Sequence, residues 1–186
     1  MQFKWTSALG MMAIAAATAI AGAQSSSTGT YLGVDVGAYF PINSTIRNVF
    51  GSTIPGVGIS FANNNQPDKL TTSFNFGVIG ANKNGNRFVA IPVTLGLGRE
   101  YGGTGTSVRP FWRAGAGAAY LDYSIDANNS GNPIASHKIA LTAVGEVGIM
   151  LSERVRLSAS YNYFSKQDDF DFTGYELKLS FLFWKL

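Results

Sequence analysis

The chain has no cysteine and only one histidine, His137. Disulfides and thiolate zinc sites are therefore excluded, and a single histidine cannot build a multi-histidine metal centre. Charged residues make up 13 % of the chain, about half of the usual share. The net charge of +3 comes without a Lys/Arg cluster, so nucleic-acid binding has no electrostatic basis. We expect no metal, no cofactor and no nucleic-acid partner.

Beyond the N-terminal region, the sequence also lacks a run of about 20 apolar residues, which argues against a membrane-spanning helix in the mature chain. The N-terminus itself has the pattern of a secretory signal, with Lys4, an apolar run over Ala8–Ala21, and small residues before Gln24. A retained anchor is the alternative, but the apolar run is short and ends in a cleavage-like site. We predict a signal peptide over residues 1–23 and one domain over 24–186.

From Tyr31 onward, apolar and polar residues alternate, as in strands with two different faces. The intervening segments are rich in Asn, Gly, Asp, Ser and Pro, which are typical of turns. Eight strands are predicted, over Tyr31–Phe40, Ile54–Ala62, Lys69–Ile79, Phe88–Gly98, Val108–Tyr123, Lys138–Leu151, Val155–Phe164 and Tyr175–Phe183. An even number of strands in a meander closes into an up-and-down barrel without edges. Pro92 conflicts with a central strand and predicts a bulge or an end of the ladder, and residues 44–50 favour a helical turn or two.

The apolar face of these strands is the bulkier one, and the opposite face is small and sparsely charged. The interior of an eight-stranded barrel is just wide enough for side chains to fill. Residues such as Val34, Leu95, Leu157 and Phe181 must therefore face lipid, while Gly, Ser, Thr, Asn and a few charges line the lumen. The predicted fold class is all-β, an eight-stranded antiparallel up-and-down transmembrane β-barrel.

The segment "VRPFWRAGAGAAYLDY" (Val108–Tyr123) fits this environment. If Arg113 points inward, Trp112 and Tyr120 face lipid about 26 Å apart along the strand. With a strand tilt of about 40°, this is roughly 20 Å of membrane height, close to the spacing of two aromatic girdles. The predicted girdle residues are Trp112, Tyr120, Tyr161, Tyr163, Tyr175, Phe181 and Phe183. The predicted polar network of the lumen is Asp35, Arg113, Glu146, Arg156, Glu176 and Lys178, since buried charges persist only when they are paired. A salt-bridged plug is favoured over an ion pathway.

The last strand, "YELKLSFLF", resembles the C-terminal recognition signal of bacterial outer-membrane barrels, with Glu176 followed by Phe181 and Phe183. Lys178 stands where that signal usually has glycine, and residues 184–186 extend past the usual final aromatic. Together with the signal peptide and the alternating strands, the chain resembles the small outer-membrane barrels of the OmpA/OmpX/OmpW-like superfamily. The resemblance implies residence in the bacterial outer membrane, contacts with its lipids and with the barrel-assembly machinery, and termini in the periplasm. Its outer loops would be Pro41–Thr53, Asn82–Asn86, Ser124–Ser136 and Ser165–Thr173.

Three motifs resemble catalytic or ligand-binding sites, but each lacks a feature that its chemistry requires. Ser136, His137 and Glu146 could supply a hydrolytic triad, but neighbours on a strand point to opposite faces and Glu146 would lie about 30 Å further along. We read His137 as an exposed histidine at the end of a loop. "GLGREYGGTG" lacks the lysine and the helix of a phosphate loop. "QDDFDF" lacks the spacing of a calcium loop and indicates a solvated loop tip.

The sequence therefore predicts a monomeric, non-enzymatic outer-membrane barrel with a structural or interaction role, in envelope integrity or loop-mediated binding. The alternatives are a narrow passage for small hydrophobic solutes, as in OmpW-like barrels, and a lipid-modifying enzyme. The passage would require an incomplete polar plug and a side opening that faces lipid.

Overall fold

The computed structural model describes residues 30–63, 68–102, 108–127, 130–152 and 154–185. The predicted signal peptide therefore lies outside the described residues. The elements are β1 (Thr30–Pro41), α2 (Ser44–Phe50), β2 (Ile54–Asn63), β3 (Leu70–Lys83), β4 (Asn86–Glu100), β5 (Arg109–Ile125), β6 (Ile134–Ser152), β7 (Val155–Phe164) and β8 (Gly174–Lys185). Among the described residues, no helix is long and apolar enough to cross a membrane.

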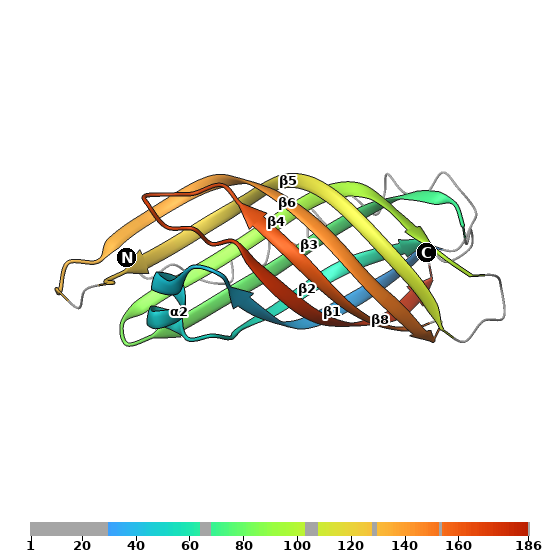
Figure 1. Ribbon diagram of the computed structural model, residues 1–186, viewed down its shortest axis with the longest axis horizontal. Coiled ribbons are helices and arrows are strands. Elements are labelled where there is room, and N and C mark those ends of the chain that lie inside the picture. The colour runs from blue at the N-terminus through green and yellow to red at the C-terminus, as the bar shows by residue number, and fades with distance from the viewer. Residues whose placement is uncertain (1–29, 64–67, 103–107, 128–129, 153, 186) are drawn as a thin grey trace.

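The strands form one closed barrel. Each strand pairs antiparallel with the next, and β8 completes the ring by pairing with β1. Figure 1 shows tilted strands around a long axis, with α2 at one end and the C-terminus at the other. We call these the α2 end and the C-terminal end. The predicted eight-stranded antiparallel up-and-down barrel is confirmed.

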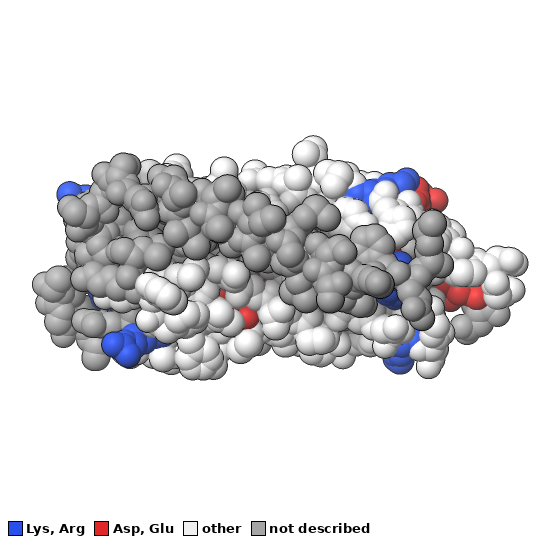
Figure 2. Space-filling model, turned by 180° about the vertical axis from the view of Figure 1, so that it is seen from behind, with Lys and Arg blue, Asp and Glu red and all other residues white. Residues whose placement is uncertain are grey.

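The two faces of the wall have the predicted polarity. The outward side chains Val34, Leu95, Leu157 and Phe181 are 39 %, 68 %, 46 % and 45 % exposed. Their inward neighbours Asp35, Thr94, Ser158 and Ser180 are buried. In Figure 2, most of the visible charged side chains lie toward the two ends of this face. An apolar outer belt around a polar interior is the arrangement of a transmembrane barrel.

The glycines of β4 and β5 permit a close approach of main chains. A Cβ at Gly96 or Gly117 would overlap a main-chain oxygen of the neighbouring strand, so any side chain there would force the strands apart. A Cβ at Gly98 would lie 2.7 Å from Cγ of Arg113. The absence of a side chain at Gly98 thus makes room in the lumen for the long Arg113 side chain.

Pro92 interrupts one of the two ladders of β4. On the β5 side, pairing runs on through Pro92 opposite Ala119. On the β3 side, pairs are present at Phe76–Val93 and again at Ile79–Ala90, but not between them. Because proline has no N–H to donate, the predicted conflict appears as a two-residue gap in the β3–β4 ladder.

The hairpin of β5 and β6 is longer than the sequence predicted. β5 continues to Ile125 and β6 begins at Ile134, where the prediction ended the strand at Tyr123 and resumed it at Lys138. Among the extra residues, Ile125 is held by packing, since its side chain is 1 % exposed. His137 therefore lies on a strand, and its prediction as a loop-end residue was wrong, although its exposure was correctly expected.

The lumen at the α2 end also differs from the prediction. Instead of small and polar residues, a buried apolar cluster fills it. Its larger members are Tyr39, Ile46, Phe50, Ile54, Phe88, Leu121, Tyr123, Phe164, Phe170 and Phe172. Helix α2 contributes Ile46 and Phe50, and its N-cap Asn43 accepts hydrogen bonds from the N–H groups of Thr45 and Ile46. The predicted helical turn thus becomes part of a plug.

Candidate functional site

All six residues of the predicted lumen network point into the barrel. The register places Arg113 of β5 opposite Glu146 of β6. Asp35 of β1 and Arg156 of β7 both lie opposite Ser180 of β8, which runs between these two strands. Lys178 and Glu176 occupy inward positions of β8, opposite Ser158 and Ser160. Period-two alternation was enough to find them, because every second residue of a strand shares a face.

Glu146 is the centre of the network. Its Oε1 lies 3.3 Å from Nζ of Lys178, and its Oε2 lies 4.0 Å from Nη1 of Arg113. The Glu146 side chain is 4 % exposed, and those of Lys178 and Arg113 are 11 % and 10 % exposed. One buried carboxylate thus holds two cations, Arg113 from the neighbouring strand β5 and Lys178 from β8, which lies beyond β7. The contacts tie β5, β6 and β8 together across the lumen.

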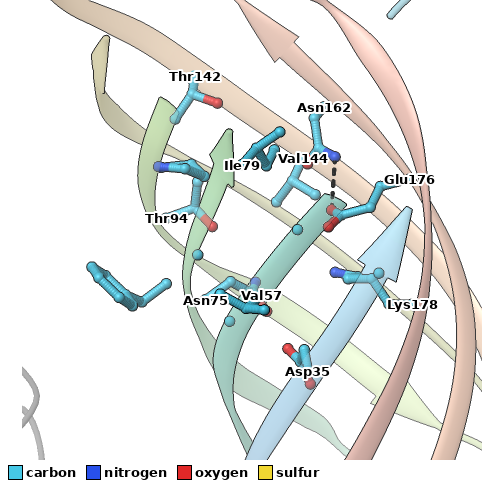
Figure 3. Close-up of a pocket in the computed structure, with 16 residues that line it drawn as sticks. Asp35, Val57, Asn75, Ile79, Thr94, Thr142, Val144, Asn162, Glu176 and Lys178 are labelled. Atoms are coloured by element: carbon cyan, nitrogen blue, oxygen red, sulfur yellow. Dashed lines mark hydrogen bonds between the residues drawn. The ribbon is translucent and has the colours of Figure 1, made fainter. Parts of the chain in front are cut away.

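The other two carboxylates of the network accept hydrogen bonds from uncharged groups. Ser60 Oγ donates to Oδ1 of Asp35 at 3.0 Å. Asn162 Nδ2 donates to Oε2 of Glu176 at 3.1 Å, as Figure 3 shows. Each carboxylate therefore has a partner, as burial requires.

The network extends further toward the C-terminal end than the sequence indicated. Nε of Arg109 lies 3.2 Å from Oε1 of Glu100, and both face inward. The Phe111 ring carries two guanidinium groups, with Cζ of Arg113 at 5.1 Å and Cζ of Arg156 at 5.4 Å from its centroid. Strand parity would have placed both side chains inward. Arg109 lies inside the predicted strand Val108–Tyr123, whereas Glu100 lies two residues past the end of the predicted strand Phe88–Gly98.

A small chamber lies between the charged residues and the apolar cluster (Figure 3). Its volume is about 40 Å³, and its lining runs from Lys178 on one side to Ile79 on the other. That volume has room for about three water molecules. Thr94, which is 3 % exposed, lines the chamber, and its hydroxyl has no hydrogen-bond partner among the described residues. The chamber has a mixed lining of charged, polar and apolar residues, and it is too small for most organic ligands.

The β7–β8 loop covers the apolar cluster at the α2 end. Its Phe172 ring stacks on Phe88 with centroids 4.8 Å apart, and its Phe170 ring packs edge-on against Tyr123 at 5.7 Å. The Tyr39 hydroxyl donates to the main-chain carbonyl of Phe172. The QDDFDF segment is therefore not only a solvated tip, since two of its rings insert into the barrel mouth.

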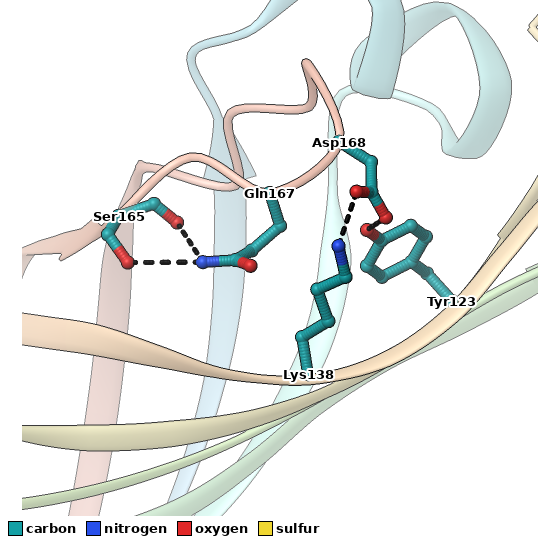
Figure 4. Close-up of polar contacts among 5 residues, drawn as sticks. All are labelled: Tyr123, Lys138, Ser165, Gln167 and Asp168. Carbon is teal, nitrogen blue, oxygen red and sulfur yellow. Dashed lines mark hydrogen bonds and ion pairs between the residues drawn. The ribbon is translucent and has the colours of Figure 1, made fainter.

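Asp168 clamps the same loop to the wall (Figure 4). Its carboxylate accepts hydrogen bonds from the Tyr123 hydroxyl at 2.6 Å and from the Lys138 ammonium. These donors hold the pKa of the Asp168 carboxyl below its usual range. Gln167 Nε2 donates to the Ser165 carbonyl at 3.3 Å, which stiffens the start of the loop.

The predicted girdle residues all lie on the outer face of the wall. Trp112, Phe181 and Phe183 lie toward the C-terminal end, where Trp112 Nε1 donates to the Tyr101 hydroxyl at 3.1 Å. The other members, Tyr120, Tyr161, Tyr163 and Tyr175, lie toward the α2 end. Tyr161 and Tyr175 pack against each other with ring centroids 5.4 Å apart.

The three residues considered as a hydrolytic triad do not come together. Ser136 and His137 point to opposite faces of β6, and Glu146 lies nine residues from His137 on the same strand. Asp168 and Asp169 lie exposed at a loop tip. Among the described residues, no group of three or more His, Cys, Asp or Glu side chains could hold a metal ion.

No protein-family model and no curated protein matches the chain. Solved structures do. The N-terminal β-barrel domain of Pseudomonas aeruginosa OprF matches with a TM-score of 0.51 and 13 % identity, over 84 % of this chain and 98 % of that one. Ail of Yersinia pestis matches at 0.52 and 15 % identity, over 83 % and 95 %. The outer-membrane enzyme PagL matches at 0.52 and 14 % identity, over 80 % and 98 %. The chain therefore has the fold of the small eight-stranded outer-membrane β-barrels.

Proposed function

We propose that this protein is a closed, monomeric barrel of the bacterial outer membrane with a structural or interaction role. It stabilises the envelope or presents its loops to partners outside the cell. The observation that carries the proposal is the double closure of the lumen. A layer of paired charges around Glu146 is followed toward the α2 end by a layer of packed rings.

Either layer is a barrier to permeation. Arg156 fills the charged layer with only 2 % exposure, and Phe172 is completely buried in the apolar layer. An ion that passed the first layer would meet a water-excluding set of rings in the second, where it would lose its hydration without compensation. A barrel closed in this way contributes its wall and its loops rather than a pore.

A flux measurement tests the proposal. The folded barrel is reconstituted in liposomes, and the entry of small sugars and amino acids is compared with that of protein-free liposomes. We expect no difference. The matched control is the double variant Arg156→Ala/Phe172→Ala, which trims both layers and should admit solute. Flux through the unchanged protein at the level of this variant would contradict the proposal.

Location and oligomeric state need a separate measurement. Cell fractionation with a heat-shift gel should recover the protein in the outer membrane, migrating as a monomer that changes mobility on boiling. Recovery as a soluble periplasmic protein would contradict the membrane assignment. The proposed role includes no catalysis, so the lipid profile of the membrane should stay the same after His137→Ala.

A narrow passage for small hydrophobic solutes is the second candidate. The gap in the β3–β4 ladder at Pro92 favours it, because a wall without hydrogen bonds is easier to part sideways. The apolar lining of the α2 end would accept such solutes. Uptake of a lipophilic dye into liposomes separates the two candidates. A passage predicts protein-dependent uptake that falls when Phe170→Trp enlarges the plug, and a closed barrel predicts none.

A further inference from the structure

A cluster of polar side chains lies on the outer face of β4, β5 and β6 near the α2 end. Arg87 Nη2 lies 2.7 Å from Oδ1 of Asp122, and His137 Nδ1 lies 3.2 Å from the same oxygen. The Tyr120 hydroxyl is 3.2 Å from His137 Nδ1, and the two rings stack within 11° of parallel. Four polar groups thus share one patch of a wall that is otherwise apolar.

The basic side chains of this patch are more exposed than its carboxylate, which favours the binding of an anion from outside the barrel. The Asp122 side chain is 16 % exposed, whereas those of Arg87 and His137 are 40 % and 62 % exposed. The carboxylate lies beneath and orients the two basic groups, which face outward. Nδ1 of His137 is directed at Asp122, so the opposite ring nitrogen takes no part in this pair. Arginine is well suited to phosphate, because its planar fork matches two of the phosphate oxygens.

An apolar groove begins at the same arginine. Its volume is about 360 Å³, within the range of roughly 300–1,000 Å³ of small-molecule sites. Its lining includes Pro55, Val57, Val78, Gly80, Arg87 and Val89. The groove forms where β3 has no paired neighbour in β2. The β2–β3 pairs begin at Gly56–Ile79 and run toward the C-terminal end, while β3 continues in the other direction to Lys83.

We propose that this groove and patch bind one lipid that carries a phosphate on its headgroup. An acyl chain lies in the groove along β2, β3 and β4, and the phosphate sits between Arg87, His137 and the Tyr120 hydroxyl. The groove is at a lipid-facing wall, so its occupant is a membrane lipid rather than a soluble ligand. This inference rests on the proposed membrane location, but it is independent of whether the lumen conducts.

Native mass spectrometry of the folded barrel in a phosphate-free detergent tests the site. The probes are dioleoyl phosphatidic acid, dioleoylglycerol without the phosphate, and glycerol 3-phosphate without the chains. We expect one retained phosphatidic acid and no comparable retention of the other two. Arg87→Gln and His137→Gln should each weaken retention about tenfold, the effect of one charge-assisted hydrogen bond. Gly80→Leu, which fills the groove, should also weaken it.

Arg154→Gln is the matched control, because it removes one exposed charge at the opposite end of the barrel. A heat-shift gel verifies that every variant is folded. Equal retention by Arg87→Gln, His137→Gln and Arg154→Gln would overturn the site. If dioleoylglycerol were retained as well as phosphatidic acid, the role of the phosphate would be overturned. If glycerol 3-phosphate were retained as well as phosphatidic acid, the role of the groove would be overturned. Liposome flux would be unaffected by any of these outcomes, so this inference and the closed-barrel proposal fail separately.

Discussion

Replacing Glu146 with glutamine removes one charge from the middle of the barrel and leaves the shape of the side chain nearly unchanged. At an effective dielectric constant of about 20, the carboxylate attracts Lys178 at 3.3 Å by about 5 kcal/mol and Arg113 at 4.0 Å by about 4 kcal/mol. Glutamine loses both attractions but avoids the cost of burying a carboxylate, which amounts to several kcal/mol. We expect Glu146→Gln to lower the free energy of unfolding by about 3 kcal/mol, in line with the removal of one partner from a buried ion pair.

Urea unfolding in phospholipid vesicles, followed by the fluorescence of Trp112 and Trp184, gives the free energy of unfolding from the midpoint at constant slope. Asp169→Asn is the control, since it removes an exposed carboxylate at a loop tip. The double variant Glu146→Gln/Lys178→Met should be less destabilised than the sum of its single changes, because it also removes the unpaired cation. A loss below about 1 kcal/mol, or strict additivity, would refute the central role of Glu146.

Three further predictions concern the loop clamp and the strand spacing. Asp168→Asn should speed tryptic cleavage after Lys166 several-fold because it weakens the ion pair to the wall, whereas Asp169→Asn should not, and equal rates would contradict the clamp. The folded-state pKa of Asp168 is lowered, so its contribution is complete above the unfolded value of about 3.9 and is lost as the pH falls through the lower folded value. Hydrogen exchange of the loop, corrected for its intrinsic pH dependence, should therefore show protection at pH 6 that declines only in strong acid. Gly117→Ala should abolish the folded band in a heat-shift gel, and Gly145→Ala should keep it, since a Cβ at position 145 meets no atom within 4 Å.

The sequence predicted the barrel wall well because its signal is local. Alternate residues of one strand share a face, so Val34 and Asp35 reveal their environments without knowledge of any other strand. The same parity put the charged residues of the lumen on the correct side. It could not show which of them meet, because the Glu146–Lys178 contact depends on the register and tilt of strands that are distant in the chain.

The apolar plug could not be predicted for a related reason. Phe88 and Phe172 stack closely, yet they come from a strand and a loop more than 80 positions apart. In the sequence, Phe172 belongs to an acidic, solvated-looking segment, and only the fold shows that its ring turns inward. The extended hairpin was missed because the turn-rich composition between Ser124 and Ser136 hid the end of β5 and the start of β6. Only the fold shows that Ile125 packs into the barrel mouth.

The seam between β1 and β8 has a consequence for how the chain is assembled. Val34 lies opposite Phe181, so the first and last strands become neighbours only after nearly the whole chain is available. Until then, both strands expose unpaired main-chain groups that could join another molecule. Closing so long a loop is also slow, because the chain loses conformational entropy before the contacts between the two strands can form. The barrel therefore stays open, with these main-chain groups unpaired, until β8 is available to pair with β1 and close the ring.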